Sequence, residues 1–383
     1  MTLPKVMSIV GTRPEAIKMA PLIRALRETG GVQEVLCLTA QHREMLDQVL
    51  SLFNLTAHYD LDIMKERQSL TYITTRALEG LEEIVRKEQP QLILVQGDTT
   101  TTLAGSLAAF YHKIPLGHVE AGLRTGDKYA PFPEEINRRL NSLLADLHFA
   151  PTAVARDNLL REGVAEEKVF VTGNTVIDAL KTTVRPDYSF PDPLLQKVDF
   201  QACRVLLVEA HRRENLGSPL EEICLALLDI LQSFTDTLLV FPVHKNPAVR
   251  STVYKYLQGH SRALLLEPLD PLSFHNLMAR SHLILTDSGG IQEEAPSLGR
   301  PVLVLRELTE RPEALKAGTA LLACTGRKSI VQKASALLQD ADAYNSMARA
   351  ANPYGDGRAS ERIRDIILHF FGQRSTLPEP FKP

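Results

Sequence analysis

Residues 283–305 read LILTDSGGIQEEAPSLGRPVLVL, and this stretch decides the fold. The apolar run Leu283–Thr286 predicts a buried strand, and the run Val302–Leu305 predicts a second one. Between them, the small polar residues 287–290 predict a turn that opens a helix over about 291–297. Strand, helix and strand in this order are typical of a parallel sheet with helices packed on it.

The turn in this stretch also has the features of a phosphate-binding loop. After the strand ends at Asp287, the sequence Ser288-Gly289-Gly290 has a backbone that a ligand can approach closely. Free N–H groups at the start of a helix bind phosphate. Glu294, one turn into the helix, is placed to accept hydrogen bonds from a ribose diol. A tight turn that binds no ligand is the alternative interpretation.

Short apolar runs alternate with longer amphipathic stretches along most of the chain. Further expected strands lie at 6–10, 35–39, 92–96, 116–119, 147–149, 205–209, 238–241 and 263–266. Residues 182–193, TTVRPDYSFPDP, interrupt the alternation with three prolines and predict a linker. We therefore expect an α/β protein with two Rossmann-like, doubly wound domains over 1–180 and 181–358, and a C-terminal helix and tail over 359–383. Ligands of such sheets bind beyond the carboxyl ends of the strands, so we expect the site in an interdomain cleft.

The composition is that of an ordinary globular protein. The chain has 383 residues, of which 44% are hydrophobic and 23% charged, with a net charge of −3. This excludes a disordered chain and a disulfide scaffold, and it argues against a nucleic-acid partner held by a global basic field. The absence of Trp argues against base-stacking platforms.

The spacing of the cysteines and the length of the apolar segments bear on the cellular compartment of the protein. Four cysteines are far apart and form no C-x-x-C pair, which predicts free thiols in a reducing cytoplasm (Cys37, Cys203, Cys224 and Cys324). No apolar stretch reaches 18 residues, so we expect no membrane partner, and the short N-terminal apolar run does not resemble a signal peptide. The 11 histidines include no H-E-x-x-H, and we expect no metal.

Basic side chains follow the first strand. The segment GTRPEAIK (11–18) forms the first strand-to-helix turn and contains Arg13 and Lys18. It matches neither G-x-G-x-x-G nor the P-loop pattern, so dinucleotide and Walker-type sites are weak interpretations. Basic residues at a helix start oppose the helix dipole, which favours a ligand contact over a solvated surface.

Three carboxylates lie at or near expected strand ends in the first half. Asp98 follows the strand 92–96, Glu120 follows the strand 116–119, and Glu134 opens a later helix. Asp98 has the alternative role of a helix N-cap, and Glu134 with Arg138, four positions on, has the alternative role of a surface ion pair. Clustered carboxylates shift one another's pKa values apart, which provides an acid and a base from one residue type.

A second group of polar residues follows strands of the second half. His211 and Arg212 come directly after the strand 205–209, in the segment HRREN. His244 in FPVHKNP and Arg311 in RELTERPEA add a histidine and an arginine. This pattern favours phosphate recognition and proton transfer, and a buried structural histidine is the alternative.

Taken together, these segments resemble the non-hydrolysing UDP-N-acetylglucosamine 2-epimerases of bacteria. The matching pieces run in family order from Gly11 to Gly357: GTRPEAIKMAP, TAQHREMLDQVL, QGDTTTTLA, GHVEAGLRTGD, PFPEEINRRL, TGNTVIDAL, HRREN, PVHKNP, TDSGGIQEEAPSLGRPVLVLRE, TERPEA and NPYGDG. The resemblance implies a GT-B-like fold with a UDP-sugar between the domains and a last helix that crosses back to the first domain. It implies interconversion of UDP-GlcNAc and UDP-ManNAc without a cofactor, by elimination of UDP to a 2-acetamidoglucal and re-addition.

The resemblance also implies roles for individual residues. The catalytic group comprises Asp98, Glu120, Glu134 and His211. The substrate contacts comprise Arg13, Lys18, Arg138, His244, Leu269, Phe274, Ser288, Gly289, Gly290, Glu294 and Arg311, where Leu269 and Phe274 match the uracil pocket and Ser288–Gly290 the diphosphate cradle. Parts of an allosteric UDP-GlcNAc pocket match Gln41, Arg67 and Arg212, whereas Glu44 stands where some members have Gln. Which carboxylate takes the proton in each direction stays open.

One position departs from the family pattern. The family usually has Thr-Gly or a similar small pair before the HRREN segment, and this chain has Glu209-Ala210. A carboxylate there would either repel a diphosphate or face away from it.

Other functions stay open at this level. A GT-B glycosyltransferase, a non-catalytic UDP-sugar sensor and a hydrolysing epimerase share parts of the pattern. The resemblance implies a homodimer and a product that supplies cell-surface polysaccharide synthesis.

Overall fold

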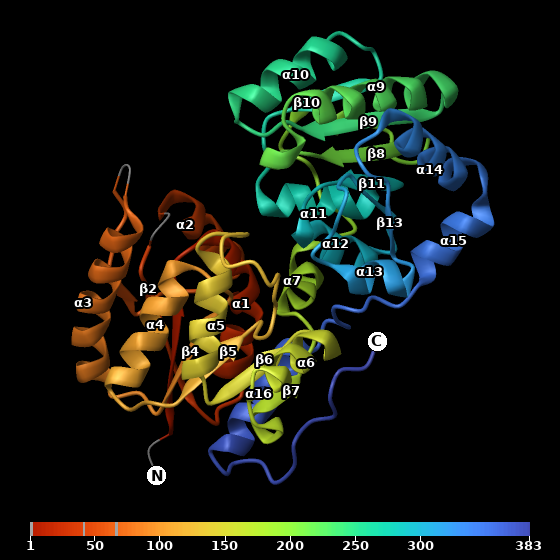
Figure 1. Cartoon of the computed structure of the whole chain (residues 1–383). Helices are drawn as coiled ribbons and strands as arrows, with labels where there is room; N and C mark the ends of the chain where they lie inside the picture. Colours follow the sequence, from red (N-terminus) through yellow and green to blue (C-terminus); the bar gives the residue numbers. More distant parts are fainter. Residues whose placement is uncertain (1–2, 41–42, 66–67) are drawn as a thin grey trace. The chain divides into compact units, whose positions relative to one another are not determined.

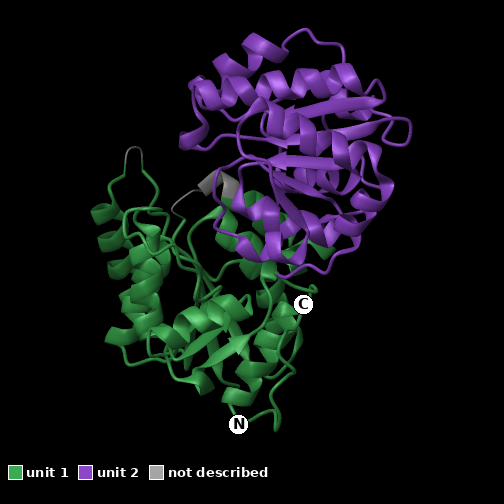
Figure 2. Ribbon diagram, turned by 45° about the vertical axis from the view of Figure 1, so that its right-hand side comes forward, with its two compact units in different colours: residues 1–181, 354–382 green, residues 182–353, 383 purple. Residues whose placement is uncertain are grey.

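The computed structural model describes residues 3–40, 43–65 and 68–383. The chain divides into two compact units (Figure 2). Unit 1 comprises residues 1–181 and 354–382, and unit 2 comprises residues 182–353 with residue 383. The expected boundaries were 180/181 and 358/359, so the chain leaves unit 1 near the expected position and returns to it a few residues earlier than expected.

Unit 1 is built on a parallel sheet of seven strands in the order β3-β2-β1-β4-β5-β6-β7 (Figure 1). The strands are β1 (Lys5–Val10), β2 (Gln33–Leu38), β3 (Tyr59–Asp60), β4 (Leu92–Gln96), β5 (Leu116–Val119), β6 (Leu147–Ala150) and β7 (Val169–Val171). Every residue of β4 is buried, as expected for a central strand covered on both faces. The strand order reverses between β1 and β4, and a ligand site is expected beyond their carboxyl ends.

Helices cover both faces of this sheet. Apolar side chains of α1, α2, α7 and α16 form a core with β1 and β2 on one face, and those of α3 and α4 form a core on the other. The helices of unit 1 are α1 (Arg13–Glu28), α2 (Arg43–Leu52), α3 (Leu70–Glu88), α4 (Thr100–Tyr111), α5 (Glu134–Leu144), α6 (Ala153–Arg161), α7 (Thr175–Thr183), whose last two residues belong to unit 2, and α16 (Ala359–Phe370), with a 3-10 turn at Glu166–Lys168.

The last helix, α16, belongs to unit 1 although unit 2 precedes it in the chain. Its residues Ile363, Ile366 and Ile367 are buried in the same core as α1. Asp178 of α7 accepts hydrogen bonds from the backbone N–H groups of Ala359 (3.2 Å) and Ser360 (2.7 Å). This side chain therefore caps the start of α16 from another helix.

Unit 2 is built on a parallel sheet of six strands in the order β10-β9-β8-β11-β12-β13. The strands are β8 (Arg204–Glu209), β9 (Thr237–Pro242), β10 (Ala263–Leu266), β11 (Leu283–Thr286), β12 (Val302–Val304) and β13 (Ala320–Leu322). The helices are α8 (Pro193–Gln196), α9 (Ser218–Ser233), α10 (Pro247–Leu257), α11 (Pro271–Arg280), α12 (Gly289–Glu294), α13 (Pro312–Ala317), α14 (Arg327–Gln339) and α15 (Ala341–Arg349), with 3-10 turns at Arg213–Asn215 and Ala295–Leu298. Here the order reverses between β8 and β11.

The core of unit 2 packs α9, α10 and α14 on one face of the sheet. Residues of the other strand face, such as Leu207 and Ile284, are buried as well, so both faces are covered. The stretch 283–305 forms β11, α12, the 3-10 turn and β12, as the sequence predicts.

The proline-rich segment after α7 differs from the expected free linker. The backbone N–H of Arg185 donates to Asn276 Oδ1 at 2.8 Å, and the Tyr188 hydroxyl lies 2.8 Å from Ser273 Oγ. Arg280 also donates to the carbonyl of Tyr188 at 2.6 Å. The segment is therefore fixed to α11 within unit 2.

The cysteines form no disulfide. All four are free, and Cys37 and Cys224 are buried, whereas Cys203 and Cys324 are half-buried. Within the described ranges, no helix is both long and apolar enough to cross a membrane.

Candidate functional site

Each unit carries a polar cluster beyond the carboxyl ends of its central strands. In unit 1 the turn after β1 is organised by Glu15, whose side chain is almost fully buried. Its Oε2 accepts hydrogen bonds from the backbone N–H groups of Gly11 (2.6 Å) and Thr12 (2.8 Å). Its Oε1 accepts from the hydroxyls of Thr99 and Thr102 at the start of α4. Glu15 therefore ties the turn after β1 to the turn after β4, and burial raises its pKa.

Lys18, one turn into α1, reaches the carboxylate that follows β5. Its Nζ lies 2.5 Å from Glu120 Oε1. Asn174 donates to the same oxygen at 2.9 Å, and Gln96, at the end of β4, donates to Oε2. Glu120 has φ of +66°, in the left-handed region, so the backbone turns sharply where the carboxylate leaves the strand. The structure thus brings together two predicted site residues, Lys18 and Glu120.

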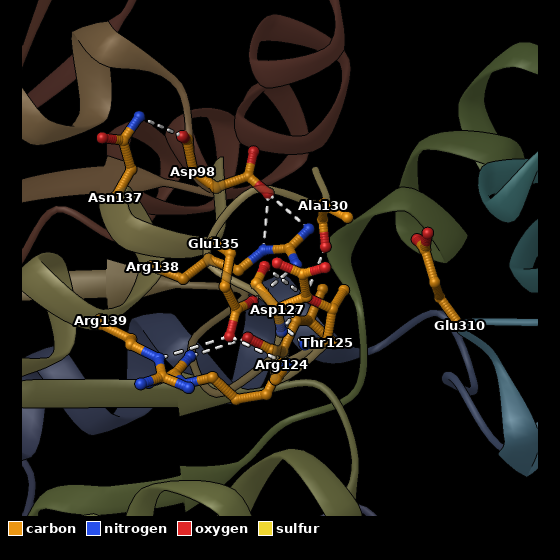
Figure 3. Close-up of polar contacts among 12 residues, drawn as sticks. Asp98, Arg124, Thr125, Asp127, Ala130, Glu135, Asn137, Arg138, Arg139 and Glu310 are labelled. Carbon is orange, nitrogen blue, oxygen red and sulfur yellow. Dashed lines mark hydrogen bonds and ion pairs between the residues drawn. The ribbon is translucent and has the colours of Figure 1, made fainter. Parts of the chain in front are cut away.

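Asp98 and Arg138, two more predicted site residues, form an ion pair in unit 1 (Figure 3). Arg138 donates from Nε at 2.8 Å and from Nη2 at 2.7 Å to Asp98 Oδ2. Asn137 donates to the Asp98 carbonyl at 2.8 Å. The N-cap of α4 is Thr99 and not Asp98, so the alternative role of Asp98 as a cap is wrong.

The two glutamates at the start of α5 have different surroundings. Glu135 is fully buried and accepts from the backbone N–H of Thr125 at 3.0 Å, and it lies 3.4 Å from both Arg138 and Arg139 (Figure 3). Glu134 is half-buried, and its Oε2 has no hydrogen-bond partner among the described residues. Arg138 therefore pairs with Asp98 and Glu135, and the alternative surface pair of Glu134 with Arg138 is not among the ion pairs of the described residues. Arg13, at the start of α1, is half-buried.

In unit 2, Asp287 organises the turn after β8. It has no solvent exposure, and its Oδ2 accepts hydrogen bonds at 2.9 Å from the backbone N–H groups of His211 and Arg212 and from Asn215 Nδ2. Burial and the negative charge of Glu209 raise the pKa of Asp287. One carboxylate after β11 thus fixes the backbone of the HRREN segment after β8.

His211 is held between a carboxylate and a second histidine. Its Nδ1 lies 2.5 Å from Glu209 Oε1 and 3.9 Å from Asp287 Oδ1. The ring of His244, from the segment after β9, stacks on it with centroids 4.9 Å apart and planes 15° apart. The hydrogen bond with Glu209 raises the pKa of His211, whereas burial and the charge of His211 lower the pKa of His244. Of the two rings, His211 is therefore the one that takes up a proton more readily.

Glu209, His211 and Asp287 each offer an atom within 4.8 Å of the others, a spacing that a metal ion can use. A zinc ion bound by both His211 and Glu209 would lie about 2.0–2.2 Å from each ligand atom. The 2.5 Å between His211 Nδ1 and Glu209 Oε1 is a hydrogen-bond distance and leaves no room for an ion between them. The separation is that of an ion pair between the two side chains.

Arg311 and the glycine turn of α12 lie side by side. A Cβ atom at Gly289 would lie 3.7 Å from the Arg311 guanidinium and 4.0 Å from Arg212 Nη2. Arg311 is oriented by Glu293, a buried residue of α12 that accepts from its Nε. Two guanidinium groups therefore border the backbone N–H groups at the start of α12, an arrangement that suits a phosphate.

The other predicted residues of unit 2 lie on α11, on α12 and in the adjoining segment. Glu294 lies beside His275, with 3.6 Å between its Oε2 and His275 Nε2, and the far ring nitrogen of His275 lies 2.8 Å from the Thr183 hydroxyl. A Cβ at Gly290 would lie 3.5 Å from Glu294 Oε1. Ser288 is the N-cap residue of α12. Phe274 on α11 and Leu269 just before it are half-buried.

The sequence reasoning missed the residues that orient the predicted ones. These are Glu15, Glu135, Asn174, Glu293 and the orienting role of Asp287. Buried carboxylates within helices were a usable signal for Glu15, Glu135 and Glu293, because a charged side chain on an apolar helix face requires a partner. Gln41 and Arg67 lie outside the described residues, and the described allosteric candidate, Arg212, lies beside Gly289.

Several known proteins are similar to this chain in sequence and in structure. The sequence profile of the UDP-N-acetylglucosamine 2-epimerase family matches residues 24–368. The UDP-N-acetylglucosamine 2-epimerase of Bacillus subtilis is 55% identical over 377 residues, which cover 98% of each chain. The crystal structure of UDP-GlcNAc 2-epimerase from Neisseria meningitidis bound to UDP-GlcNAc is 48% identical, with a TM-score of 0.86 over 95% of this chain and 100% of that one.

More distant structures extend the likeness. The UDP-GlcNAc 2-epimerase of Methanocaldococcus jannaschii, solved with UDP-GlcNAc and UDP, is 34% identical, with a TM-score of 0.76 over 95% of this chain and 99% of that one. A glycotransferase of kitacinnamycin, at 10% identity and a TM-score of 0.65, shares the fold alone. The predicted GT-B-like α/β fold of two Rossmann-like units is confirmed. Because both the family profile and the relatives match nearly the whole length, the chain belongs to the UDP-N-acetylglucosamine 2-epimerase family, a family of isomerases.

Proposed function

We propose that the protein interconverts UDP-GlcNAc and UDP-ManNAc by inverting the configuration at C2 of the sugar. The observation that carries this proposal is a set of three carboxylates in unit 1, of which Asp98 follows β4, Glu120 follows β5 and Glu134 opens α5. Asp98 and Glu120 are each paired with a cation, whereas Glu134 has an oxygen without a partner among the described residues. Such a set offers carboxylates with different partners, as candidates for the removal and return of a proton at one carbon.

The reaction that we propose is an elimination followed by an addition. A carboxylate removes the C2 proton, the electron pair of that bond forms the C1–C2 double bond, and UDP leaves C1 with the electrons of the C–O bond. The intermediate is a 2-acetamidoglucal, and re-addition of UDP with proton delivery to the opposite face of C2 gives the epimer. No redox cofactor is required, because no hydride leaves the sugar.

Unit 1 supplies the groups for the sugar in this proposal. Glu134 is the candidate for the first proton acceptor in one direction, because its Oε2 is not already occupied by a donor among the described residues. Asp98 and Glu120 are the candidates for the return of the proton. Lys18 and Arg138 orient these carboxylates, and Arg13 contacts the sugar-phosphate end of the substrate.

Unit 2 supplies the groups for UDP. Arg311, His211 and the N–H groups of the Ser288–Gly290 turn bind the diphosphate and stabilise the charge that develops as UDP departs. Glu294 accepts hydrogen bonds from the ribose. Leu269 and Phe274 border the uracil, and His244 supports His211 through the ring stack.

The proposal is tested by one incubation in deuterated water. Purified protein is mixed with UDP-GlcNAc, and proton and phosphorus NMR follow the products. We expect UDP-ManNAc with deuterium at C2, and recovered UDP-GlcNAc that also gains deuterium there. Product that retains the substrate's own C2 hydrogen would contradict the elimination.

The same experiment separates the competing functions. A glycosyltransferase leaves UDP-GlcNAc unchanged until an acceptor is added, a sensor binds it without turnover, and a hydrolysing epimerase releases UDP and free ManNAc. Glu134→Gln is the test variant and Glu313→Gln is its control. Both glutamates lie in the first turn of a helix, Glu134 in α5 and Glu313 in α13. We expect deuterium exchange to fall at least ~100-fold in Glu134→Gln alone.

A further inference from the structure

Both carboxylate oxygens of Glu209, the last residue of β8, contact a neighbouring side chain. Its Oε1 lies 2.5 Å from His211 Nδ1, and its Oε2 accepts a hydrogen bond from the Thr286 hydroxyl at 3.1 Å. Its side chain is 19% exposed and that of His211 is 31% exposed. The carboxylate therefore neither faces away from the HRREN segment nor stands as an unpaired negative charge, which were the two expectations for this position.

The imidazole of His211 is fixed from several directions. The backbone N–H of His211 donates to Asp287, the ring stacks on His244, and Nδ1 faces Glu209. No described residue forms a hydrogen bond with Nε2. A ring held in this way has one nitrogen committed to the protein and the other available to a ligand.

We propose that Glu209 is a positioning residue for His211, which it keeps protonated on Nδ1 so that Nε2–H is presented to the diphosphate of the nucleotide sugar. This inference rests on the proposed function for the identity of the ligand, but the Glu209–His211 pairing stands on geometry alone. With a neutral residue at position 209 the ring would lose its positive charge more readily. A neutral imidazole carries a proton on only one nitrogen, and in its Nδ1–H form the unprotonated Nε2 is an acceptor, which is the wrong partner for a phosphate oxygen.

The groups around the His211 ring shift its pKa in opposite directions. Glu209 and Asp287 favour the protonated form, while Arg212 and burial oppose it. His244 lies against the ring, and burial and the charge of His211 lower the pKa of His244. The hydrogen bond with Glu209 is the largest of these influences, so the net effect raises the pKa of His211.

In the elimination, this arrangement places a donor at the leaving group. The C2–H electron pair forms the double bond, the C1–O bond breaks, and the negative charge moves to the β-phosphate oxygen. Nε2–H of His211 donates a hydrogen bond to that oxygen, and Glu209 stabilises the positive ring while it does so. The carboxylate thus assists phosphate binding through the histidine, although alone it would repel a phosphate.

The test follows the ring of His211 in the free protein, with no substrate. Nitrogen-15 NMR of the histidine side chains reports the tautomer and the titration of His211 in the wild type, Glu209→Gln and Glu214→Gln. Glu214 is the matched control, because it lies in the same segment and pairs with Arg306. We expect the His211 pKa to fall by about one unit or more in Glu209→Gln and to stay within ~0.3 unit of the wild type in Glu214→Gln.

A second readout uses UDP as the probe. Calorimetry at pH 8 should show UDP binding at least ~10-fold weaker in Glu209→Gln than in the wild type, with the difference shrinking as the pH is lowered and protonation of the ring becomes easier in both. If Glu209→Gln does not fold, Thr286→Val replaces it in the test. This variant keeps the carboxylate but removes the hydrogen bond to its Oε2, and a smaller fall of the His211 pKa is expected.

An unchanged His211 titration in the folded variant would overturn the inference. A shift of the wild-type His211 signals on addition of a chelator would also overturn it, because a metal would then occupy Nδ1. If the pKa falls as expected but the deuterium experiment shows no epimer, the proposed function fails and the Glu209–His211 pairing stands.

Discussion

Lys18 Nζ lies 2.5 Å from Glu120 Oε1, although 102 positions separate the two residues in the chain. The contact forms because α1 begins beyond β1 and Glu120 lies beyond β5, on the same edge of a parallel sheet. The Glu120 side chain is 6% exposed and that of Lys18 20%, so the pair is largely removed from water. Removing one partner of such a pair leaves a charge without compensation.

We therefore expect Lys18→Met to destabilise the protein by roughly 3 kcal/mol. Glu120→Gln should cost less, because Gln keeps an oxygen for Asn174 and Lys18 stays partly solvated. The double variant should recover part of the loss, and denaturant unfolding of all four proteins measures the coupling. Strictly additive losses would show that the two side chains do not interact in solution.

The Asp98–Arg138 pair provides a second test. Arg138 uses two nitrogens of one guanidinium on Asp98 and lies 3.4 Å from Glu135, a geometry that an ammonium group cannot reproduce (Figure 3). Arg138→Lys should therefore lower kcat/KM for epimerisation by roughly 100-fold, with little change in melting temperature. Steady-state kinetics by coupled detection of UDP-ManNAc measures the effect.

Arg139→Lys is the control for this substitution. Arg139 is the next residue, its side chain is 48% exposed, and it lies 3.4 Å from the same Glu135. We expect its kcat/KM to stay within about twofold of the wild type, because one exposed ion pair contributes little. Equal losses in both variants would mean that Glu135, and not the contact with Asp98, explains the effect.

The fold was predictable where the strands are long and buried. The runs at β1, β4 and β8 have five or six residues, four of them apolar in each strand, and they alternate with helical stretches. By contrast, β3 has two residues and β7 and β13 have three each, and these short strands were not predicted. These strands exist because a neighbouring strand offers hydrogen bonds, and pairing of this kind is not visible in a local window.

The candidate site was also predictable only in part. Residues directly after strands, such as Asp98, Glu120 and His211, follow from the rule that ligands bind beyond the carboxyl ends of parallel strands. Their partners did not follow, because spacing rules cover one helix at a time. The i,i+4 rule favoured Glu134 as the partner of Arg138, whereas the ion pair joins Arg138 to Asp98, 40 positions away.

Glu15 leads to a prediction about stability and geometry together. Glu15→Ala leaves two backbone N–H groups and two hydroxyls without their acceptor, and we expect a loss of about 3 kcal/mol. Glu15→Gln should lose much less, because its oxygen can accept from the N–H groups while the threonine hydroxyls turn to accept from its amide. Chemical denaturation measures both, and Glu28→Ala, whose side chain is 69% exposed at the end of the same helix, should change stability by less than ~0.5 kcal/mol.

His118 predicts how the stability of unit 1 depends on pH. It is fully buried in β5, its Nε2 lies 2.7 Å from the Gly97 carbonyl, and burial lowers its pKa to about 4. Between pH 4 and the unfolded value of about 6.5, the unfolded chain binds a proton at this residue and the folded chain does not. Stability therefore falls as the pH drops through this window, and a shift of this size corresponds to about 3 kcal/mol.

His118→Gln removes this titration but keeps an N–H donor near the Gly97 carbonyl. We expect the variant to be less stable than the wild type at pH 7 and to lose less stability between pH 7 and pH 5, measured as the melting temperature of the first thermal transition. His112→Gln, at the end of α4, is the control for replacing a histidine of unit 1 by glutamine outside the sheet. A buried neutral imidazole takes up its proton only when the chain unfolds, so removing His118 should remove that part of the acid sensitivity. A variant that loses as much stability on acidification as the wild type would therefore show that other groups dominate this pH window.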